Sequence, residues 1–384
     1  MKENTVQHFL HESYLDYQQT HKMPLYQMKA VEKMMACRTE ALGGHAIYCE
    51  EGHLNGVWYN SCRHRGCPQC NAMKTEQWLQ QAKSLLLDCT HHHWVFTLPY
   101  DLLDIWRFNR SLCHTLLFQS VNQTIKTLSA DKQYLGAAPG MLLALHTWAR
   151  NQTLHPHIHC LISHGGLDKA GNWQTPKRKS FLPAGVMKQL FRGKFLDGIK
   201  TALKAGELVV PTDMTAQGVI NLCNKLGRKE WVIHCVKPYQ YGEGVAKYLA
   251  RYIRGGAIKN SQIIKVTKDR VRFRYKSHQT KQTEYLNLKH DEFMQRLLNH
   301  IPIPKKQQYQ FVGIYHGCCR AKLDKARAHL GQKAFQKVEK IDWKDYVASK
   351  GEQQCCKECG KALTRLIDLE NLEEPQQLEI LTLH

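Results

Sequence analysis

The sequence predicts an α+β fold, in which a largely antiparallel sheet is flanked by helices and preceded by a small zinc-binding module. Short runs rich in β-branched and aromatic residues alternate with helical patterns through the middle of the chain. Two pairs of these runs are close enough in sequence to form hairpins: residues 141–148 with 157–162, and 263–266 with 271–275. A cluster of cysteines and histidines precedes them, between Cys37 and Cys70.

The chain of 384 residues has room for two or three domains of roughly 100–200 residues each. Its residue composition and hydrophobic pattern change at two places, which predicts three segments. Residues 1–88 hold the Cys/His cluster, residues 89–300 alternate strand and helix patterns, and residues 301–384 form a helical section with a second cysteine cluster and an acidic tail from residue 368.

The individual elements follow from hydrophobic periodicity. We expect strands at residues 93–98, 141–148, 157–162, 231–236, 263–266 and 271–275. We expect helices at residues 73–87, 102–128, 184–203, 244–253 and 320–330.

The charge balance predicts a polyanionic partner. Lys and Arg outnumber Asp and Glu by 54 to 33, which gives a formal net charge of +21. We find no apolar run of about 20 residues and no signal-peptide pattern, so we expect a protein without a membrane span that works in the cytoplasm. In a reducing compartment, 15 cysteines are expected to be metal ligands or core residues, not disulfides.

The N-terminal cluster has the spacing of zinc sites. Its strongest element is Cys67-Pro-Gln-Cys70, a tight turn that presents two thiolates to one Zn²⁺. Eight candidate ligands allow two tetrahedral sites: Cys37, His45, Cys49, His53, Cys62, His64, Cys67 and Cys70. Arg63 and Arg65 flank these ligands, where they could contact DNA phosphates or simply face solvent.

A second motif is the alternation of His157 and His159 with apolar residues. On a strand, both imidazoles would project from one face, which is half of a divalent-metal site. A hairpin with residues 141–148 would bring His146 beside them as a third ligand. Such a site with open positions suits Mg²⁺ or Mn²⁺ holding a phosphate oxygen.

Other interpretations of this motif stay open. An isolated His-x-His pair is more often two surface histidines. Gln240 and Glu243 compete with His146 for the third position, and His155 is a weaker candidate because it precedes Pro156.

Tyr248 and Tyr252 lie four residues apart in the predicted helix 244–253, so both phenols share one face, with their Cβ atoms about 5–6 Å apart. Two tyrosines at this spacing often serve only packing, at the edge of the apolar side that a helix turns toward the core. A phenol can also attack a phosphodiester and keep its energy in a phosphotyrosine bond. Because the ordinary phenol pKa is about 10, nearby cations must favour the phenolate. The same helix supplies Lys247, Arg251 and Arg254.

Late in the chain, Cys356 and Cys359 form a further zinc half-site whose partners the spacing does not fix. Candidate partners are Cys355, His316, Cys318 and Cys319. Two stretches almost free of acids, residues 177–204 and 247–276, fit a groove that follows a DNA backbone.

Taken together, these motifs resemble one family. The segments LGGH, YNSC and CPQC of the cluster, the His157/His159 strand and the segment KYLARYI with its two tyrosines resemble the two-tyrosine HUH transposases of the insertion-sequence 91 family. The similarity runs from the N-terminus to about residue 331. The cluster departs from the family pattern at Cys49-x3-His53, which puts its exact zinc ligands in question.

The resemblance implies an HUH endonuclease core in residues 89–300 and a zinc-dependent DNA-binding module in residues 1–88. It implies that His157 and His159 bind the catalytic metal, that Tyr248 and Tyr252 are nucleophiles, and that the partners are single-stranded ends of an insertion element and a target site. The setting would be bacterial and close to the nucleoid. A rolling-circle replication initiator or conjugative relaxase is the nearest alternative, and a non-catalytic zinc-dependent DNA-binding protein is an alternative of another class.

Overall fold

The computed structural model describes residues 3–176, 181–239, 244, 256–277, 279–342, 345–346, 349–350 and 355–369. The chain folds into two compact units. Unit 1 consists of residues 1–77, 254–301 and 339–384, and unit 2 of residues 78–253 and 302–338. The segments expected from the sequence follow chain order, whereas the units interleave: the first unit takes in a middle segment and the C-terminal one. Within the described residues, no helix is long and apolar enough to cross a membrane.

Unit 2 is built on a six-stranded antiparallel sheet with the order β11-β4-β5-β3-β7, and β6 pairs with β5 outside this path. The strands are β3 (His91–Thr97), β4 (Ala138–Trp148), β5 (Leu154–Leu167), β6 (Trp173–Gln174), β7 (Ile233–Tyr239) and β11 (Tyr309–Gly313). The predicted strands at residues 93–98, 141–148, 157–162 and 231–236 correspond to β3, β4, β5 and β7. The hairpin of β4 with β5 is confirmed, and so is the α+β fold class with its antiparallel sheet flanked by helices.

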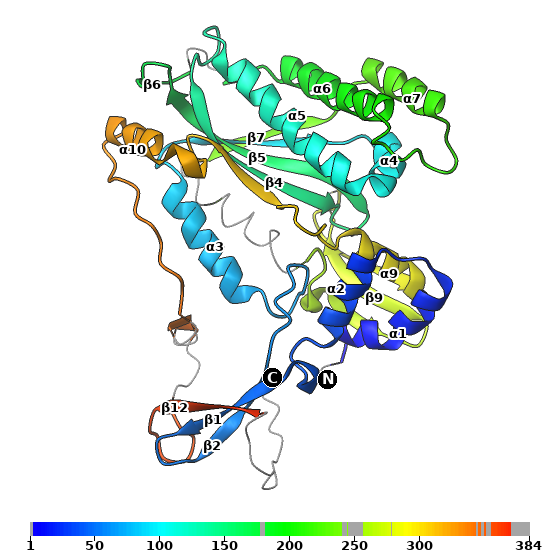
Figure 1. The fold of residues 1–384 in the computed structure, drawn as a ribbon, viewed down its shortest axis with the longest axis vertical. Helices are drawn as coiled ribbons and strands as arrows, with labels where there is room; N and C mark the ends of the chain where they lie inside the picture. Colours follow the sequence, from blue (N-terminus) through cyan, green and yellow to red (C-terminus); the bar gives the residue numbers. More distant parts are fainter. Residues whose placement is uncertain are drawn as a thin grey trace. The chain divides into compact units, whose positions relative to one another are not determined.

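Helices cover both faces of this sheet (Figure 1). On one face, Ile158 and Cys160 of β5 are fully buried in a large apolar cluster with the helices. On the other face, Leu161 packs in a smaller cluster with Trp78 and Leu323. The helices of this unit are the later part of α3 (Ala72–Leu85), α4 (Leu103–Phe108), α5 (Arg110–Ala130), α6 (Ala184–Lys204), α7 (Ala216–Arg228) and α10 (Arg320–His329), with short turns η2 (Tyr100–Leu102) and η4 (Gly317–Cys319). Alternate residues of β5 thus have an apolar partner on each side, which makes the sheet a rigid support.

The prediction of a single helix at residues 102–128 is wrong in one respect: Asn109 divides this stretch into α4 and α5. The backbone of Asn109 leaves the helical region, at φ −126° and ψ 41°. Its side chain donates to the carbonyl of Val209 and accepts from the amide of Val209, each at 2.7 Å. This competition between side-chain and helix hydrogen bonds is typical of asparagine.

Among its described residues, unit 1 holds two small sheets and the helices α1, α2 and α9, besides the start of α3. The sheet β10-β9-β8 packs one face against α1 and α9, through Val271 and Phe273. The other sheet has the order β12-β1-β2. The elements are α1 (Val6–Thr20), α2 (Leu25–Met35), η1 (Glu40–Leu42), β1 (Gly44–Cys49), β2 (Leu54–Tyr59), the start of α3, η3 (Asn260–Gln262), β8 (Ile263–Val266), β9 (Arg270–Lys276), β10 (Thr283–Lys289), α9 (His290–Asn299) and β12 (Leu363–Asp368).

β12 corrects the prediction for the C-terminal section. We expected an acidic tail to begin at Asp368, but this residue ends a strand that pairs antiparallel with β1, where Asp368 lies opposite His45. The rest of the tail, from residue 370, lies outside the described residues. A partner strand more than 300 residues away supplies the hydrogen bonds that local sequence did not indicate.

Candidate metal centres and nucleic-acid interface

Three histidines converge on one face of the unit 2 sheet. His157 and His159 are two residues apart on β5, and the antiparallel pairing of β4 with β5 places His146 directly opposite His157. The ligand nitrogens of the three rings lie within 4.8 Å of one another, and all three side chains are buried. The structure therefore brings together the three residues that the hairpin argument predicted.

The two β5 imidazoles are held with the same nitrogen facing inward. The Nδ1 of His157 lies 2.7 Å from the carbonyl oxygen of His155, so Nδ1–H donates and Nε2 keeps its lone pair. The Nδ1 of His159 hydrogen-bonds to Nε2 of His93 on β3, at 2.8 Å. The two Nε2 atoms are 3.2 Å apart, within the ~2.9–3.4 Å that two nitrogens on one metal at about 2.1 Å would show.

Burial keeps these rings neutral. It lowers the pKa of His157 to about 4, and lowers the pKa of His146 and His159 well below the ordinary value of 6.5. A neutral imidazole is the form that binds a metal. The sequence did not identify His93 as part of this site, because only its position in a predicted strand pointed to it. His155 was considered as a metal ligand through its ring, whereas its backbone carbonyl accepts a hydrogen bond from His157.

Four cysteines of the N-terminal cluster form a first zinc-type centre in unit 1, which we call the four-cysteine centre: Cys37, Cys62, Cys67 and Cys70. The sulfurs of Cys62 and Cys70 are 3.7 Å apart, and those of Cys37 and Cys67 are 3.6 Å apart. Tetrahedral zinc with Zn–S bonds near 2.3 Å would separate its sulfurs by about 3.8 Å. The geometry fits one Zn²⁺.

The thiols of the four-cysteine centre differ in how readily they lose a proton. Hydrogen bonds from Cys37 and its neighbours lower the pKa of Cys70, whereas the hydrogen bond with Cys37 raises the pKa of Cys67. At least one thiolate is therefore favoured before a metal arrives, as a zinc ligand requires.

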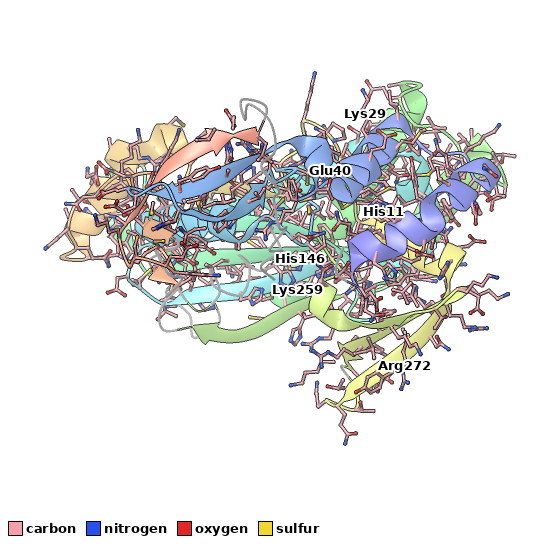
Figure 2. All side chains as sticks on the ribbon, turned by 90° about the horizontal axis from the view of Figure 1, so that it is seen from below. His11, Lys29, Glu40, His146, Lys259 and Arg272 are labelled. Atoms are coloured by element: carbon pink, nitrogen blue, oxygen red, sulfur yellow. The ribbon has the colours of Figure 1, made fainter. Side chains whose placement is uncertain are left out.

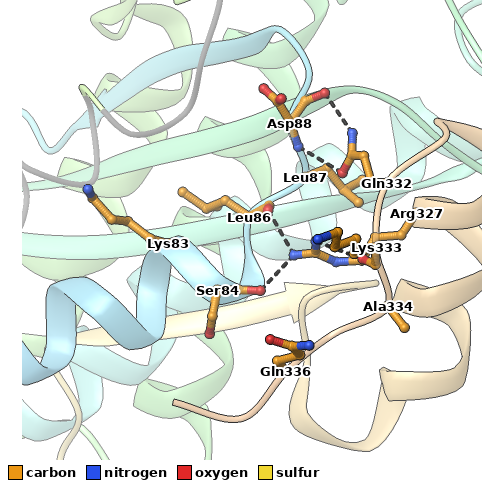
Figure 3. A pocket seen from close by; sticks show the side chains of 10 residues that line it. All are labelled: Lys83, Ser84, Leu86, Leu87, Asp88, Arg327, Gln332, Lys333, Ala334 and Gln336. Atoms are coloured by element: carbon orange, nitrogen blue, oxygen red, sulfur yellow. Dashed lines mark hydrogen bonds between the residues drawn. The ribbon is translucent and has the colours of Figure 1, made fainter. Parts of the chain in front are cut away.

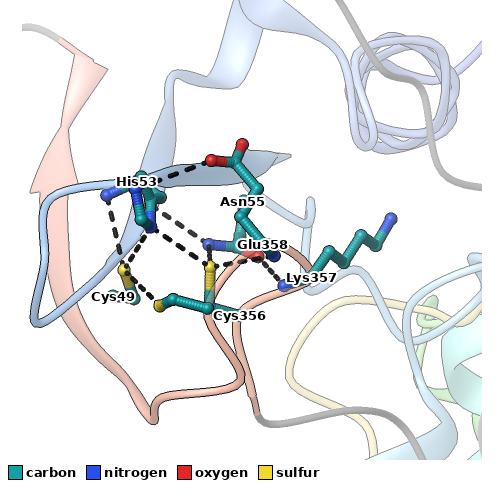
Figure 4. Close-up of polar contacts among 7 residues, drawn as sticks. Cys49, His53, Asn55, Cys356, Lys357 and Glu358 are labelled. Carbon is teal, nitrogen blue, oxygen red and sulfur yellow. Dashed lines mark hydrogen bonds and ion pairs between the residues drawn. The ribbon is translucent and has the colours of Figure 1, made fainter.

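The remaining cysteine of the N-terminal cluster and one of its three histidines lie beside the late cysteine pair. Cys49 and His53 lie with Cys356 and Cys359 in a second group, which we call the cysteine-histidine centre (Figure 4). Burial raises the pKa of the Cys356 thiol, but hydrogen bonds from the Asn55 side chain and the Glu358 backbone outweigh it and lower that pKa to about 6. The sequence had proposed other partners for Cys356 and Cys359.

Two predicted zinc ligands, and the partners predicted for Cys356 and Cys359, lie outside the two cysteine-containing centres of unit 1. His45 lies outside both cysteine-containing centres of unit 1, because it pairs through Nδ1 with Asp368 of the neighbouring strand at 2.7 Å. His64 also lies outside them: its Nδ1 accepts from the amide of Gly66 at 3.2 Å, and its backbone amide donates to Cys62 Sγ. Cys355 is in neither centre, and His316, Cys318 and Cys319 form a separate, largely exposed group in unit 2.

The predicted nucleophiles lie outside the described residues. This applies to Tyr248 and Tyr252, to Lys247, Arg251 and Arg254, and to the alternative metal ligands Gln240 and Glu243. Of the predicted DNA contacts, Arg63 is described: it is exposed, with a left-handed backbone at φ 53°. Arg65 is half-buried between His64 and Gly66.

Comparison with known proteins gives matches for the N-terminal segment and for the middle of the chain. A family model described as "Putative transposase" (Y2_Tnp) matches residues 140–322, and one described as "Transposase zinc-binding domain" (Zn_Tnp_IS91) matches residues 9–98. The chain is 34% identical over 281 residues to "Putative transposase y4qJ" of Sinorhizobium fredii (strain NBRC 101917 / NGR234), which covers 72% of this chain and 71% of that protein. It is 29% identical over 298 residues to "Transposase for insertion sequence element IS801" of Pseudomonas savastanoi pv. phaseolicola, covering 75% and 70%.

The chain belongs to the transposases of the insertion-sequence 91 family. The resemblance found in its motifs is thereby confirmed, and the alternatives of an initiator and of a non-catalytic binding protein gain no support. A solved structure titled as the conjugative relaxase TrwC in complex with oriT DNA, metal-bound, aligns with 41% of this chain and 69% of its own, at 9% identity and a TM-score of 0.22. That likeness is too slight to carry an argument.

This transposase also presents a basic sheet surface in unit 1, which we call the basic face. On β9, Val271 and Phe273 are buried while Arg272, Arg274 and Lys276 are exposed, so the cations share one side of the sheet. Arg272 is labelled in Figure 2. The guanidinium of Arg272 lies over the ring of Tyr285, 5.0 Å from its centroid, and that ring is 52% exposed. The basic face comprises Lys265, Arg270, Arg272, Arg274, Lys276, Tyr285 and Lys289.

The basic face combines the two elements that bind unpaired nucleic acid, namely cations along a strand and an exposed aromatic ring. In its three strands the one carboxylate, Glu284, lies on the opposite side and accepts from the hydroxyl of Tyr275. The run of charge noted in residues 247–276 therefore has an ordered face over β9.

A pocket of about 590 Å³ in unit 2 is unrelated to the histidines (Figure 3). Arg327 of α10 donates to the carbonyls of Ser84 and Leu86, at 2.6 and 3.2 Å, where α3 ends. Gln332 exchanges two hydrogen bonds with the backbone of Asp88. Arg327 thus satisfies the last carbonyls of α3, and the pocket is the surface left between these two tied segments.

Proposed function

We propose that this transposase cleaves and rejoins single-stranded DNA in a metal-dependent reaction, with Tyr248 and Tyr252 as the nucleophiles, and so moves an insertion sequence by a rolling-circle-like route. The observation that carries this proposal is the convergence of three buried, neutral imidazoles on one face of a rigid sheet. Family membership supports the substrate and the reaction type.

Each cleavage is a transesterification. The phenolate oxygen of one tyrosine attacks the phosphorus, the P–O3′ bond breaks, and the leaving oxygen takes up a proton to become a free 3′-hydroxyl. The 5′-phosphate remains on the tyrosine. A 3′-hydroxyl then attacks this phosphotyrosine, and the phenol leaves. Because one phosphodiester is exchanged for another, the two steps are nearly isoenergetic, and two tyrosines allow a second strand to be cut while the first is held.

His146, His157 and His159 would hold the ion. Mg²⁺ or Mn²⁺ bound there would polarise a phosphate oxygen as a Lewis acid. The chain itself fixes the donor atoms: the carbonyl of His155 and the ring of His93 orient the β5 imidazoles so that Nε2 faces inward. Apolar packing on both sides of β5 keeps the three rings in register.

The tyrosine segment follows directly from this sheet. β7 ends at Tyr239 and pairs with β3, which in turn pairs with β5. Only eight residues separate Tyr239 from Tyr248. The link between these tyrosines and the histidine centre is therefore short in sequence, and family membership is what supports it.

The DNA partner is proposed to be single-stranded element ends and target DNA. The basic face supports an unpaired strand as ligand, because it joins exposed cations to an exposed tyrosine. We propose that residues 1–88 contribute most of the zinc-dependent recognition module and that the catalytic part lies within residues 89–300, with segments of residues 254–384 completing both units. The proposed setting is the bacterial cytoplasm close to the nucleoid.

The test is a covalent adduct. Full-length protein is incubated with Mn²⁺ and single-stranded DNA from the flanks of its own gene, and a protein–DNA species resistant to denaturation is mapped to its residue by mass spectrometry. We expect an adduct on Tyr248 or Tyr252, lost in the double Phe variant and kept in Tyr100→Phe, a matched control at an exposed tyrosine. An adduct that survives the double substitution would show that these tyrosines are not the nucleophiles.

A second arm separates the element substrate from a plasmid origin. Cleavage of element flanks but not of plasmid origins supports a transposase substrate. Cleavage of origin DNA alone would point to a replication initiator or relaxase.

A further inference from the structure

The cysteine-histidine centre joins the two ends of unit 1. Cys49 is the last residue of β1, and His53 lies in the turn before β2. Cys356 and Cys359 come from a knuckle just before β12, more than 300 residues later in the chain. The four side chains nevertheless place their ligand atoms within 4.8 Å of one another.

The distances match a single tetrahedral ion. Cys49 Sγ lies 3.7 Å from Cys359 Sγ, against the ~3.8 Å expected for two sulfurs on one Zn²⁺. The Nδ1 of His53 lies 3.5 Å from Cys49 Sγ and 3.8 Å from Cys356 Sγ, against about 3.6 Å expected for nitrogen and sulfur. The 3.7 Å between the sulfurs also excludes a disulfide, whose S–S bond is about 2.0 Å.

Surrounding groups orient the ligands, as they do in zinc sites. The Nε2 of His53 lies 3.6 Å from a carboxylate oxygen of Glu358, which directs Nδ1 to the sulfurs. Cys49 Sγ accepts from the amide of His53 at 3.3 Å. Cys356 Sγ accepts from the Asn55 side chain at 3.2 Å.

The sheet next to this centre lies apart from the larger apolar clusters of the described residues. None of the described residues of β1, β2 and β12 belongs to any of the three buried apolar clusters. Ala46 and Ile47 of β1 are buried, but they lie outside those larger clusters. Small modules of this kind gain stability from a bound metal. β12 pairs with β1 along its length, from Asp368 opposite His45 to Leu363 opposite Cys49.

We propose that Cys49, His53, Cys356 and Cys359 bind one Zn²⁺ that ties the C-terminal strand β12 to the N-terminal hairpin of β1 and β2. The N-terminal zinc-binding module is then incomplete without residues 355–369. This inference concerns the fold of unit 1 and does not depend on the proposed chemistry of the histidine centre.

The first experiment counts zinc in the full-length protein by mass spectrometry. We expect the two cysteine-containing centres to hold two zinc ions, so that Cys359→Ser binds one zinc ion per chain fewer than the unaltered protein, whatever the histidine centre holds. Cys355→Ser is the matched control, because this exposed neighbour belongs to neither centre, and it should keep as much zinc as the unaltered protein. If Cys359→Ser retains as much zinc as Cys355→Ser, the proposed ligand set is wrong.

A second measurement covers the case in which Cys359→Ser folds poorly. Unaltered protein, stripped and reloaded with Co²⁺, should show thiolate-to-cobalt charge-transfer bands, which the histidine centre cannot give, from two centres: one with four sulfurs and one with three sulfurs and a nitrogen. His53→Cys should convert the second spectrum to the four-sulfur type while keeping two ions. A single spectral species, or a His53→Cys spectrum identical to that of the unaltered protein, would overturn the proposal. Neither readout depends on DNA cleavage.

Discussion

The histidine centre and the cysteine-histidine centre use metal ligands in opposite ways. The histidines lie on adjacent strands of a six-stranded sheet with apolar clusters on both faces, so the fold positions the ligands whether or not an ion is bound. The cysteine-histidine centre lies beside a three-stranded sheet with no such cluster among its described residues. In the first case packing positions the ligands, and in the second we expect the proposed zinc ion to supplement the packing of a small sheet.

Metal removal should give the largest contrast. With a strong chelator at neutral pH, the amides of β1, β2 and β12 should lose their protection from hydrogen exchange, while those of β4 and β5 keep theirs. The physical reason is that zinc binding contributes on the order of 10 kcal/mol to such small modules. Hydrogen-exchange mass spectrometry of the full chain measures both sheets at once. Equal loss in both sheets, or in neither, would contradict the contrast.

The next effect concerns activity without unfolding. His157→Ala should lower DNA–protein adduct formation at least 100-fold, because it removes a ligand of the proposed catalytic ion, while the thermal midpoint changes little. His11→Ala, at an exposed histidine of α1, is the control. Normal adduct formation by a folded His157→Ala protein would remove the metal role of this strand.

A smaller effect is expected at His93, which contacts the Nδ1 of His159 and acts as a positioning residue. His93→Phe should weaken Mn²⁺ binding about 10–100-fold, the usual cost of losing a partner of a ligand. His93→Gln, which can still hydrogen-bond, should recover part of the affinity. Calorimetric Mn²⁺ titration measures both variants, and unchanged affinity in His93→Phe would show that the contact does not tune the centre.

Acid should destabilise unit 2 by a few kcal/mol. Burial lowers the pKa of His91 and of His92 from 6.5 to about 4, so the unfolded chain binds protons more readily. The contribution of these neutral histidines to the free energy of unfolding is fully present above about pH 6.5 and is lost as the pH falls toward 4. Between pH 7.5 and 5, His91 alone should lower the free energy of unfolding by about 2 kcal/mol. Urea titrations of metal-free protein at both pH values test this, and His91→Gln should show a weaker pH dependence.

The smallest effect is expected on the basic face. Arg272→Ala should weaken binding of single-stranded DNA about tenfold and make the dependence on salt less steep, since one phosphate contact and the stack on Tyr285 are lost. Tyr285→Phe should bind like the unaltered protein, and Tyr285→Ala should not. Fluorescence anisotropy at several salt concentrations measures this, and identical curves for Arg272→Ala would place the DNA elsewhere.

Much of unit 2 could be predicted from the sequence, because its signals are local. The alternation in residues 157–162 predicts the shared face of His157 and His159, and a short connection to residues 141–148 predicts the hairpin that brings His146 to them. The tight turn Cys67-x2-Cys70 likewise predicted half of the four-cysteine centre. Close spacing gives close contact, since few conformations connect residues so near in the chain.

Contacts between distant segments were decided only by the tertiary structure. The sequence could not assign Cys356 and Cys359 to Cys49 and His53, because ligand spacing carries no information across 300 residues. It gave no reason to choose His93 from three consecutive histidines, since the register of β3 against β5 selects the ring that reaches His159. By itself the sequence determined the family, the fold class and which side chains carry the chemistry. The pairing of distant strands decided which of them meet, because burial and sheet register depend on segments that no local pattern connects.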